Sequence, residues 1–180
     1  MNIVKLVILS ILLPLLVSTT LSQTTGESTA DKQDSYIDFQ IRGIQFGSTY
    51  SKAVKAFGRP VRRTIKNFNG GNDCFEKSGS FWRLQYPGLR VGLIAGDGHG
   101  PRVIGFTITS KRWTVSGVRT GQSLAIVERT LGKPSRIDNG AGRVVSYYYE
   151  SRYYENRGTE VEFIFRNGRL VRIALAPDVC

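Results

Sequence analysis

Residues that commonly build metal centres and hydrolytic sites are scarce in this chain. Its 180 residues include two cysteines and one histidine. Cys74, His99 and Cys180 lie at scattered spacings that match no metal-ligand pattern. The chain also lacks a Gly-x-Ser-x-Gly nucleophile motif. We therefore expect no bound metal, no cofactor and no enzymatic activity.

Two features leave a small hydrolase open as an alternative. Asp97 and His99 stand in the glycine-rich segment 96–101 between two expected strands, where a flexible hairpin loop is the simpler interpretation. Four glutamates near one another could act as paired carboxylates, but neighbouring arginines explain them more simply as exposed ion pairs. The acids are Glu150, Glu155, Glu160 and Glu162, and the arginines are Arg152, Arg157 and Arg172.

Long apolar runs are absent beyond the first residues of the chain. Residues 6–17 are apolar apart from Ser10 and Pro14, and small residues follow shortly afterwards. This pattern predicts a secretory signal peptide over residues 1–22, with an uncleaved N-terminal anchor as the alternative. We expect an exported protein, periplasmic or extracellular, without a transmembrane segment once the signal is cleaved. Export also disfavours a nucleic-acid partner.

Export bears on the two cysteines as well. An oxidising compartment permits a disulfide between Cys74 and Cys180. It would close a loop of about 100 residues and stabilise the fold by roughly 4 kcal/mol. Cys180 is the last residue and is prone to fraying, which opposes the bond. The sequence leaves both states open.

After a polar leader over residues 23–35, which we expect to be disordered, the chain carries an internal repeat. Residues 43–62 and 117–136 align at a constant offset of 74 residues, with glycines, a proline, an arginine and apolar positions matching. Self-similarity of this kind marks a duplicated structural unit. We expect a first repeat over residues 36–116 and a second over residues 117–180.

Each repeat is expected to form a helix followed by strands. Ser48 and Ser123 are plausible N-caps, and Gly58 and Gly132 end the helices shortly before a proline. Period-two alternation of apolar residues then predicts antiparallel strands. The predicted fold class is α+β, a tandem repeat of helix plus antiparallel β-meander with the helices packed on one face of the sheet. The strands of the two units could align into one longer sheet.

The alternation also assigns side chains to the two faces of the sheet. Those expected to point toward the helices are Trp82, Leu84, Val161, Phe163, Val171 and Ile173. Those expected on the opposite face, called the open face below, are Arg83, Arg90, Thr107, Tyr148 and Arg172.

The register of the last hairpin depends on the turn near Asn167. A two-residue loop would place Phe163 opposite Arg172 and mix apolar and charged residues on one face. A three-residue loop over residues 166–168 avoids this mixture. We therefore predict the longer loop, with Gly168 at positive φ.

Five tyrosines lie close together between residues 147 and 154. Alternation directs Tyr147 and Tyr149 to the core and Tyr148 to the open face. Exposed tyrosines flanked by arginines are typical of binding surfaces, and the alternative is that they cap the edge of the sheet. The predicted partner-binding residues are Arg83, Arg90, Tyr148, Tyr153, Tyr154 and Arg172.

The formal net charge of the chain is +11, and it is unevenly distributed. Residues 37–116 carry thirteen Lys or Arg against four acids, whereas residues 117–180 carry ten against seven. The excess predicts an anionic partner, such as phospholipid headgroups, an acidic glycan or an acidic protein. A solvated basic surface is the alternative. The predicted anion-binding residues are Lys52, Lys55, Arg59, Arg62, Arg63 and Lys66.

Both repeats carry Gly-[Ile/Val]-x-x-Gly-x-[Ser/Thr], a helical stretch and [Phe/Leu]-Gly-x-Pro before the strands. This pattern resembles the β-lactamase-inhibitor-protein-like fold, which includes tandem-repeat inhibitors and the single-repeat SmpA/OmlA-type envelope lipoproteins. The resemblance covers nearly all of the mature chain and implies a binding module that uses the open face of its sheet. The chain departs from these proteins in lacking a lipobox cysteine and in having one cysteine per half.

The sequence therefore predicts an exported, non-enzymatic binding or scaffold module of the cell envelope. It would engage a protein partner through the open face and act as a monomer. The alternative is an electrostatic binder of anionic lipid or glycan that uses the basic first repeat.

Overall fold

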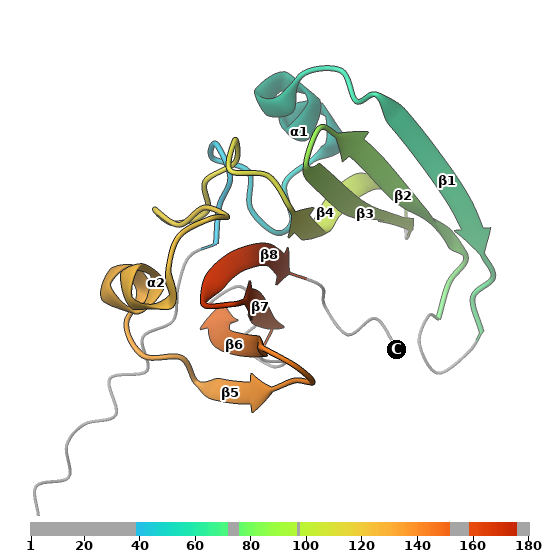
Figure 1. Ribbon diagram of the computed structural model, residues 1–180. Helices are drawn as coiled ribbons and strands as arrows, with labels where there is room; N and C mark the ends of the chain where they lie inside the picture. The colour runs from blue at the N-terminus through green and yellow to red at the C-terminus, as the bar shows by residue number, and fades with distance from the viewer. Residues whose placement is uncertain (1–38, 72–75, 97, 152–158, 176–180) are drawn as a thin grey trace, which may run out of the picture. The chain divides into compact units, whose positions relative to one another are not determined.

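The computed structural model describes residues 39–71, 76–96, 98–151 and 159–175, all of which belong to a compact unit spanning residues 34–180. The elements in chain order are α1 (Tyr50–Phe57), β1 (Arg62–Phe68), β2 (Gly79–Tyr86), β3 (Leu89–Gly96), β4 (His99–Ile108), α2 (Leu124–Leu131), β5 (Arg136–Asn139), β6 (Val144–Ser151), β7 (Thr159–Arg166) and β8 (Arg169–Leu175) (Figure 1). The predicted signal peptide and leader lie outside the described residues, as do Cys74, Asp97, Tyr153, Tyr154 and Cys180.

The eight strands form a single antiparallel sheet in the order β1-β2-β3-β4-β8-β7-β6-β5. Within each half of this order, neighbouring strands follow one another in the chain. The two halves are joined where Phe106, Thr107 and Ile108 of β4 pair with Leu175, Ala174 and Ile173 of β8. Among the described residues, no helix is long and apolar enough to cross a membrane.

The predicted α+β class, with two helix-plus-meander repeats, is wrong. The structure is mostly one eight-stranded antiparallel sheet, and its two helices have only eight residues each. Helices this short bury few side chains: Ala53 on α1, and Val127 and Leu131 on α2. Most of the core therefore comes from the strands, and β4 and β8 pair with each other instead of ending two separate sheets as unprotected edges.

The ends of the helices follow local chemistry. Thr49 caps α1, because its hydroxyl accepts a hydrogen bond from the Lys52 amide at 3.3 Å. The predicted cap Ser48 is wrong, since this residue is buried and its hydroxyl accepts a bond from the Gln45 amide. Ser123 is the N-cap of α2, as predicted, although its side chain makes no capping bond.

The predicted helix ends are confirmed. Gly58 and Gly132 have φ of 84° and 82°, a region that glycine enters without steric cost. Each donates its amide hydrogen at 2.8 Å to the carbonyl four residues earlier, in Val54 and Glu128 respectively. The two short helices thus stop at defined positions.

One face of the sheet, together with the helices and loops, forms a continuous apolar core. Phe57 of α1 meets both Tyr86 of β2 and Trp113 edge to face, each with ring centroids 5.6 Å apart. Tyr149 meets Phe163 in the same manner at 5.2 Å. Such contacts contribute beyond simple area burial. The largest fully buried side chains include Leu84, Leu93, Ile108, Phe163, Phe165 and Ile173.

The β7–β8 turn differs from the predicted one. Arg166 lies opposite Arg169, so Asn167 and Gly168 alone form the loop. Their φ values are 52° and 70°, and positive φ at both central residues is what a type I′ turn requires. Positive φ at Gly168 is confirmed, but the three-residue loop is wrong.

A register shift between Ile164 and Phe165 explains why the shorter turn is compatible with a sound core. Val171 is the extra residue of β8, so Phe163 faces Ile173 and not Arg172. Val171 is consequently 39% exposed, and its predicted place toward the helices is wrong. Trp82 is only half-buried on the helix side, where it meets Tyr50 of α1.

We expect Phe163→Ala to lower the free energy of unfolding by about 3–5 kcal/mol, because it opens a cavity in the core. Val171→Ala should change it by less than about 0.5 kcal/mol, as exposed substitutions usually do. Urea denaturation followed by circular dichroism measures both. A large cost for Val171→Ala would show that the strand register of β8 is misassigned.

Alkaline pH should destabilise the fold. Burial, together with the charge of Glu128, raises the pKa of Tyr149 above its ordinary value of 10.0, and burial likewise raises the pKa of Tyr86 and Tyr147. The folded state therefore keeps phenolic protons that the unfolded state releases, so stability falls as pH rises above about 10.

Tyr149→Phe should reduce the rate at which the free energy of unfolding falls with pH, by up to about 1.4 kcal/mol per pH unit. The same variant at neutral pH measures the separate cost of losing the bond from the Tyr149 hydroxyl to the Gly132 carbonyl. If the free energy of unfolding stays constant to well above the ordinary tyrosine pKa, the raised pKa values of these buried tyrosines are contradicted.

Candidate functional site

A row of directly opposed residues crosses all eight strands on the open face. The pairing registers place each member beside the next, from one edge of the sheet to the other. The row consists of Arg136, Tyr148, Glu162, Ala174, Thr107, Arg90, Gln85 and Arg62. Opposed residues in antiparallel strands have Cβ atoms about 4.5–5.5 Å apart, so the row is a continuous surface feature.

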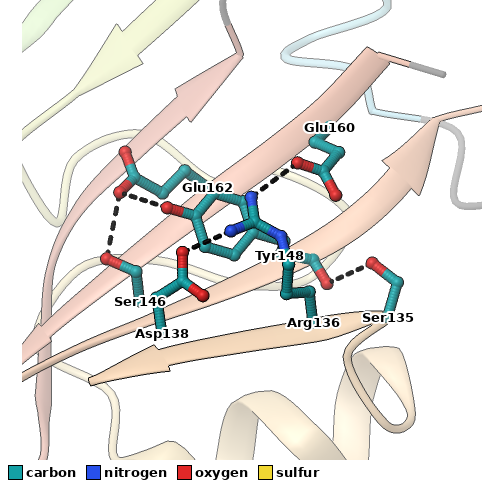
Figure 2. A network of polar contacts seen from close by, with 7 residues as sticks. All are labelled: Ser135, Arg136, Asp138, Ser146, Tyr148, Glu160 and Glu162. Atoms are coloured by element: carbon teal, nitrogen blue, oxygen red, sulfur yellow. Dashed lines mark hydrogen bonds and ion pairs between the residues drawn. The ribbon is translucent and has the colours of Figure 1, made fainter.

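Tyr148 lies at the centre of a polar network on β5, β6 and β7 (Figure 2). The Arg136 guanidinium lies over its ring, 3.6 Å from the centroid. The Tyr148 hydroxyl donates to a carboxylate oxygen of Glu162 at 3.2 Å, and the Ser146 hydroxyl donates to the same oxygen at 2.9 Å. Ser135 donates through both its amide and its hydroxyl to the Tyr148 carbonyl, each at 2.8 Å.

Two arginines flank this network with ion pairs. Arg136 pairs with Glu160 at 2.8 Å and also with Asp138. Arg172 of β8 pairs with the second oxygen of Glu162 at 3.5 Å. The ring of Tyr148 is thus held between an arginine on its face and a carboxylate at its hydroxyl, which fixes its rotamer.

The electrostatics of the network favour one protonation state. Burial, followed by the charges of Glu162 and Asp138, raises the pKa of Tyr148 above its ordinary value. The hydrogen bond to Glu160 raises the pKa of Arg136 further. Near neutral pH the phenol therefore remains a hydrogen-bond donor and the guanidinium remains charged.

Small side chains occupy the middle of the open face. Ala174 and Thr107 separate the network from Arg90, and Gly92 lies opposite Gly105 in the neighbouring row. A groove of about 280 Å³ opens at the turn between β2 and β3. Its lining includes Gln85, Arg90, Thr107 and Thr109. This part of the face offers a recess beside exposed cations.

The far end of the open face is basic and aromatic. Phe68 of β1 and Phe81 of β2 lie with ring centroids 4.8 Å apart, and a Cβ at Gly79 would come within 2.6 Å of the Phe68 ring. Lys66 and Arg83 are exposed beside them. In the described portions of β1 to β4, no acidic residue lies on this face.

The structure brings four of the predicted partner-binding residues onto one face. Tyr148 and Arg90 belong to the same row, Arg83 lies in the neighbouring row, and Arg172 contacts Glu162. Tyr147 and Tyr149 are buried, as the alternation predicted. The predicted ion pairs are confirmed for Glu162, which pairs with Arg172, whereas Glu160 pairs with Arg136, which was not among the predicted partners. Glu150 forms no ion pair with a described residue, and Glu155, Arg152 and Arg157 lie outside the described residues.

Sequence reasoning missed Arg136 and Asp138. They stand on β5, which has four residues, all of them exposed. Without a buried residue, the strand shows no apolar alternation from which it could be recognised. The one available signal was Arg136 itself, which repeats Arg62 at the fixed offset of the two matching windows.

The predicted anion-binding residues do not form one patch. Arg62 and Lys66 project from the open face of β1, whereas Arg63 projects from the helix side, where its guanidinium lies 5.4 Å from the centroid of the Trp82 ring. Lys52 and Lys55 are exposed on α1. Arg59 is exposed between α1 and β1.

Of the candidate catalytic pair Asp97 and His99, only His99 lies within the described residues. His99 is exposed at the first position of β4 and lies opposite Gly96, so it belongs to a hairpin. In the part of the chain that the structure describes, no group of three or more His, Cys, Asp or Glu residues could hold a metal ion.

Comparisons with protein families, with curated proteins and with solved structures found no match for the chain. The resemblance to β-lactamase-inhibitor-like proteins therefore stays a prediction from the sequence.

Proposed function

We propose that the chain is an exported, non-enzymatic binding module of the cell envelope that engages a protein partner through the open face of its sheet. The observation that carries the proposal is Tyr148, held between Arg136 and Glu162 in a row that crosses every strand. Tyrosine and arginine are enriched among the residues that dominate binding energy in protein interfaces. Export rests on the signal-peptide pattern of residues 1–22.

The size and order of the face suit a protein partner. A row of eight strands at about 4.8 Å spacing extends roughly 34 Å along the sheet, which accommodates a standard interface of about 800 Å² per partner. Because the Arg136–Tyr148 stack is already formed, binding does not have to immobilise these side chains. Preorganisation of this kind improves affinity.

The charge pattern narrows the kind of partner. Around Tyr148 the face alternates in sign, with Arg136 and Arg172 beside Glu160 and Glu162. Toward β1, the charged side chains that the described part of this face carries are all cations. A complementary surface needs both signs in a defined arrangement, which a folded protein provides more readily than a uniformly charged polymer.

The test is an affinity capture from envelope extracts at physiological salt with matched variants. Arg83→Ala combined with Tyr148→Ala should weaken binding of the retained partner by about 1–4 kcal/mol if either is a hot spot. Lys133→Ala removes the same charge beside α2 and should bind as the wild type does. Titration of the purified partner by calorimetry quantifies the difference.

Circular dichroism should show that the double variant remains folded. An unfolded double variant would mean that the two faces of the sheet have been assigned the wrong way round. A folded variant that retains full binding, or an extract from which the wild type captures nothing, would overturn the proposed function.

A second candidate function is binding to anionic lipid or glycan at the β1 edge. The specific observation is that two apolar side chains are exposed among cations there, with Val61 at 74% and Ile65 at 43% exposure. Arg63 shares the helix side of this edge strand with Ile65, and Arg62 and Lys66 flank these side chains from the open face. Apolar side chains interleaved with cations are typical of segments that contact charged lipid surfaces.

Binding at this edge should weaken steeply with salt, because the Debye length falls from about 10 Å at 0.1 M to about 3 Å at 1 M. Sedimentation with vesicles containing phosphatidylglycerol, or retention on heparin, measures it. Arg62→Gln with Lys66→Gln should reduce binding, while Arg129→Gln with Lys133→Gln should not. Binding that is insensitive to salt would eliminate this candidate.

A further inference from the structure

Four cations line a second groove, and none of them belongs to the network around Tyr148. It has a volume of about 780 Å³ and is lined by the loop between β4 and α2, by Ile126 of α2 and by the first residue of β8. Figure 1 draws this loop in yellow. Its polar lining comprises Ser110, Lys111, Arg112, Arg119, Thr120, Gln122 and Arg169. No acidic residue contributes to the lining.

The groove is held open by backbone hydrogen bonds. The Gly121 amide donates to the Leu170 carbonyl at 2.7 Å, and the Leu170 amide donates to the Gln122 carbonyl at 2.9 Å. The Gln122 side chain accepts a bond from the Arg119 amide, also at 2.9 Å. These bonds tie the loop to β8, so the cations are positioned by ordered backbone on both sides.

Within the part of the chain that the structure describes, no acid neutralises the charges in the groove. None of the four cations forms an ion pair with an acid in the described ranges. Arg169 donates only to the Gly121 carbonyl, at 3.4 Å. Like charges that converge on one recess repel each other, and an anion that enters it relieves this repulsion.

Thr120 adds a polar group without a partner. It lines the groove and is only 8% exposed. Its hydroxyl makes no hydrogen bond with any residue that the structure describes. The hydroxyl oxygen reaches the surface of the groove, where it can donate a hydrogen bond to an oxygen of a bound ligand.

The donor set indicates the class of ligand. Three guanidinium groups present paired N–H donors that match the oxygens of phosphate. A groove of this volume falls within the range of small-molecule sites, about 300–1,000 Å³. We propose that the groove binds a phosphate-bearing ligand, either a free phosphate ester or the headgroup of a phospholipid. This proposal does not depend on the open face.

Calorimetric titration with inorganic pyrophosphate tests the proposal on the full chain. Lys111→Gln with Arg112→Gln should weaken binding about tenfold or more, since each bond to a charged group contributes well over the free energy of a neutral one. Arg119→Gln with Arg169→Gln should do the same. The matched control is Lys52→Gln with Lys55→Gln on α1, which removes the same charge and should bind as the wild type does.

Thermal melts identify variants that lose structure. The variant with Lys111→Gln and Arg112→Gln keeps the hydrogen bond from the Arg169 side chain to the Gly121 carbonyl. Sedimentation with phosphatidylcholine vesicles, with and without phosphatidylglycerol, distinguishes a free phosphate ester from a phospholipid headgroup as the ligand. Groove-dependent sedimentation with the anionic vesicles identifies a lipid headgroup, and binding of pyrophosphate without it identifies a free ester. Absent pyrophosphate binding, or equal loss in the α1 control, overturns the proposal.

Discussion

The pairing of β4 with β8 is the contact on which the rest of this structure depends. It involves three residue pairs, fewer than any other ladder in the sheet. Thr107 and Ala174, its central pair, connect Arg90 on one side with Glu162 on the other. If this ladder opened, β4 and β8 would each expose unpaired backbone groups, and the row across the open face would be divided into two.

The same sheet also shows how a local irregularity preserves a global pattern. The Asn167–Gly168 turn favours a two-residue loop, and a regular continuation would direct Arg172 toward Phe163. The bulge at Val171 resolves this conflict, because one extra residue shifts the register of the rest of β8 by one position. Arg172 is then free to reach Glu162 on the open face. Turn chemistry and core packing are both satisfied, at the expense of one exposed valine.

Features governed by neighbouring residues were predictable from the sequence. The helices end at Gly58 and Gly132 because of the local conformation of glycine. Tyr147 and Tyr149 point to the opposite face from Tyr148 because side chains alternate along a strand. The two-residue turn at Asn167–Gly168 is also local, but the bulge at Val171 that makes it compatible with the core was not predicted. The fold class and the second groove were not predictable in the same way. Each depends on residues distant in the chain: β4 must meet β8, and Lys111 and Arg119 must meet Arg169. Charge counts over a sequence range cannot show such convergence, so the basic groove was missed while a dispersed set of cations was proposed.

The two surfaces differ in how their charge is balanced, and this difference separates their roles. Around Tyr148 each arginine has an acidic partner within the sheet, so the protein itself compensates the charge and the side chains hold a fixed geometry. Such a surface gains specificity from shape and from the positions of both signs. In the groove, Arg119 and Arg169 have no acidic partner among the described residues. That surface gains affinity from the entering anion itself. Because acids of the sheet balance the arginines around Tyr148 and leave the groove unbalanced, raising the salt concentration should affect binding in the groove more strongly than binding at the network around Tyr148.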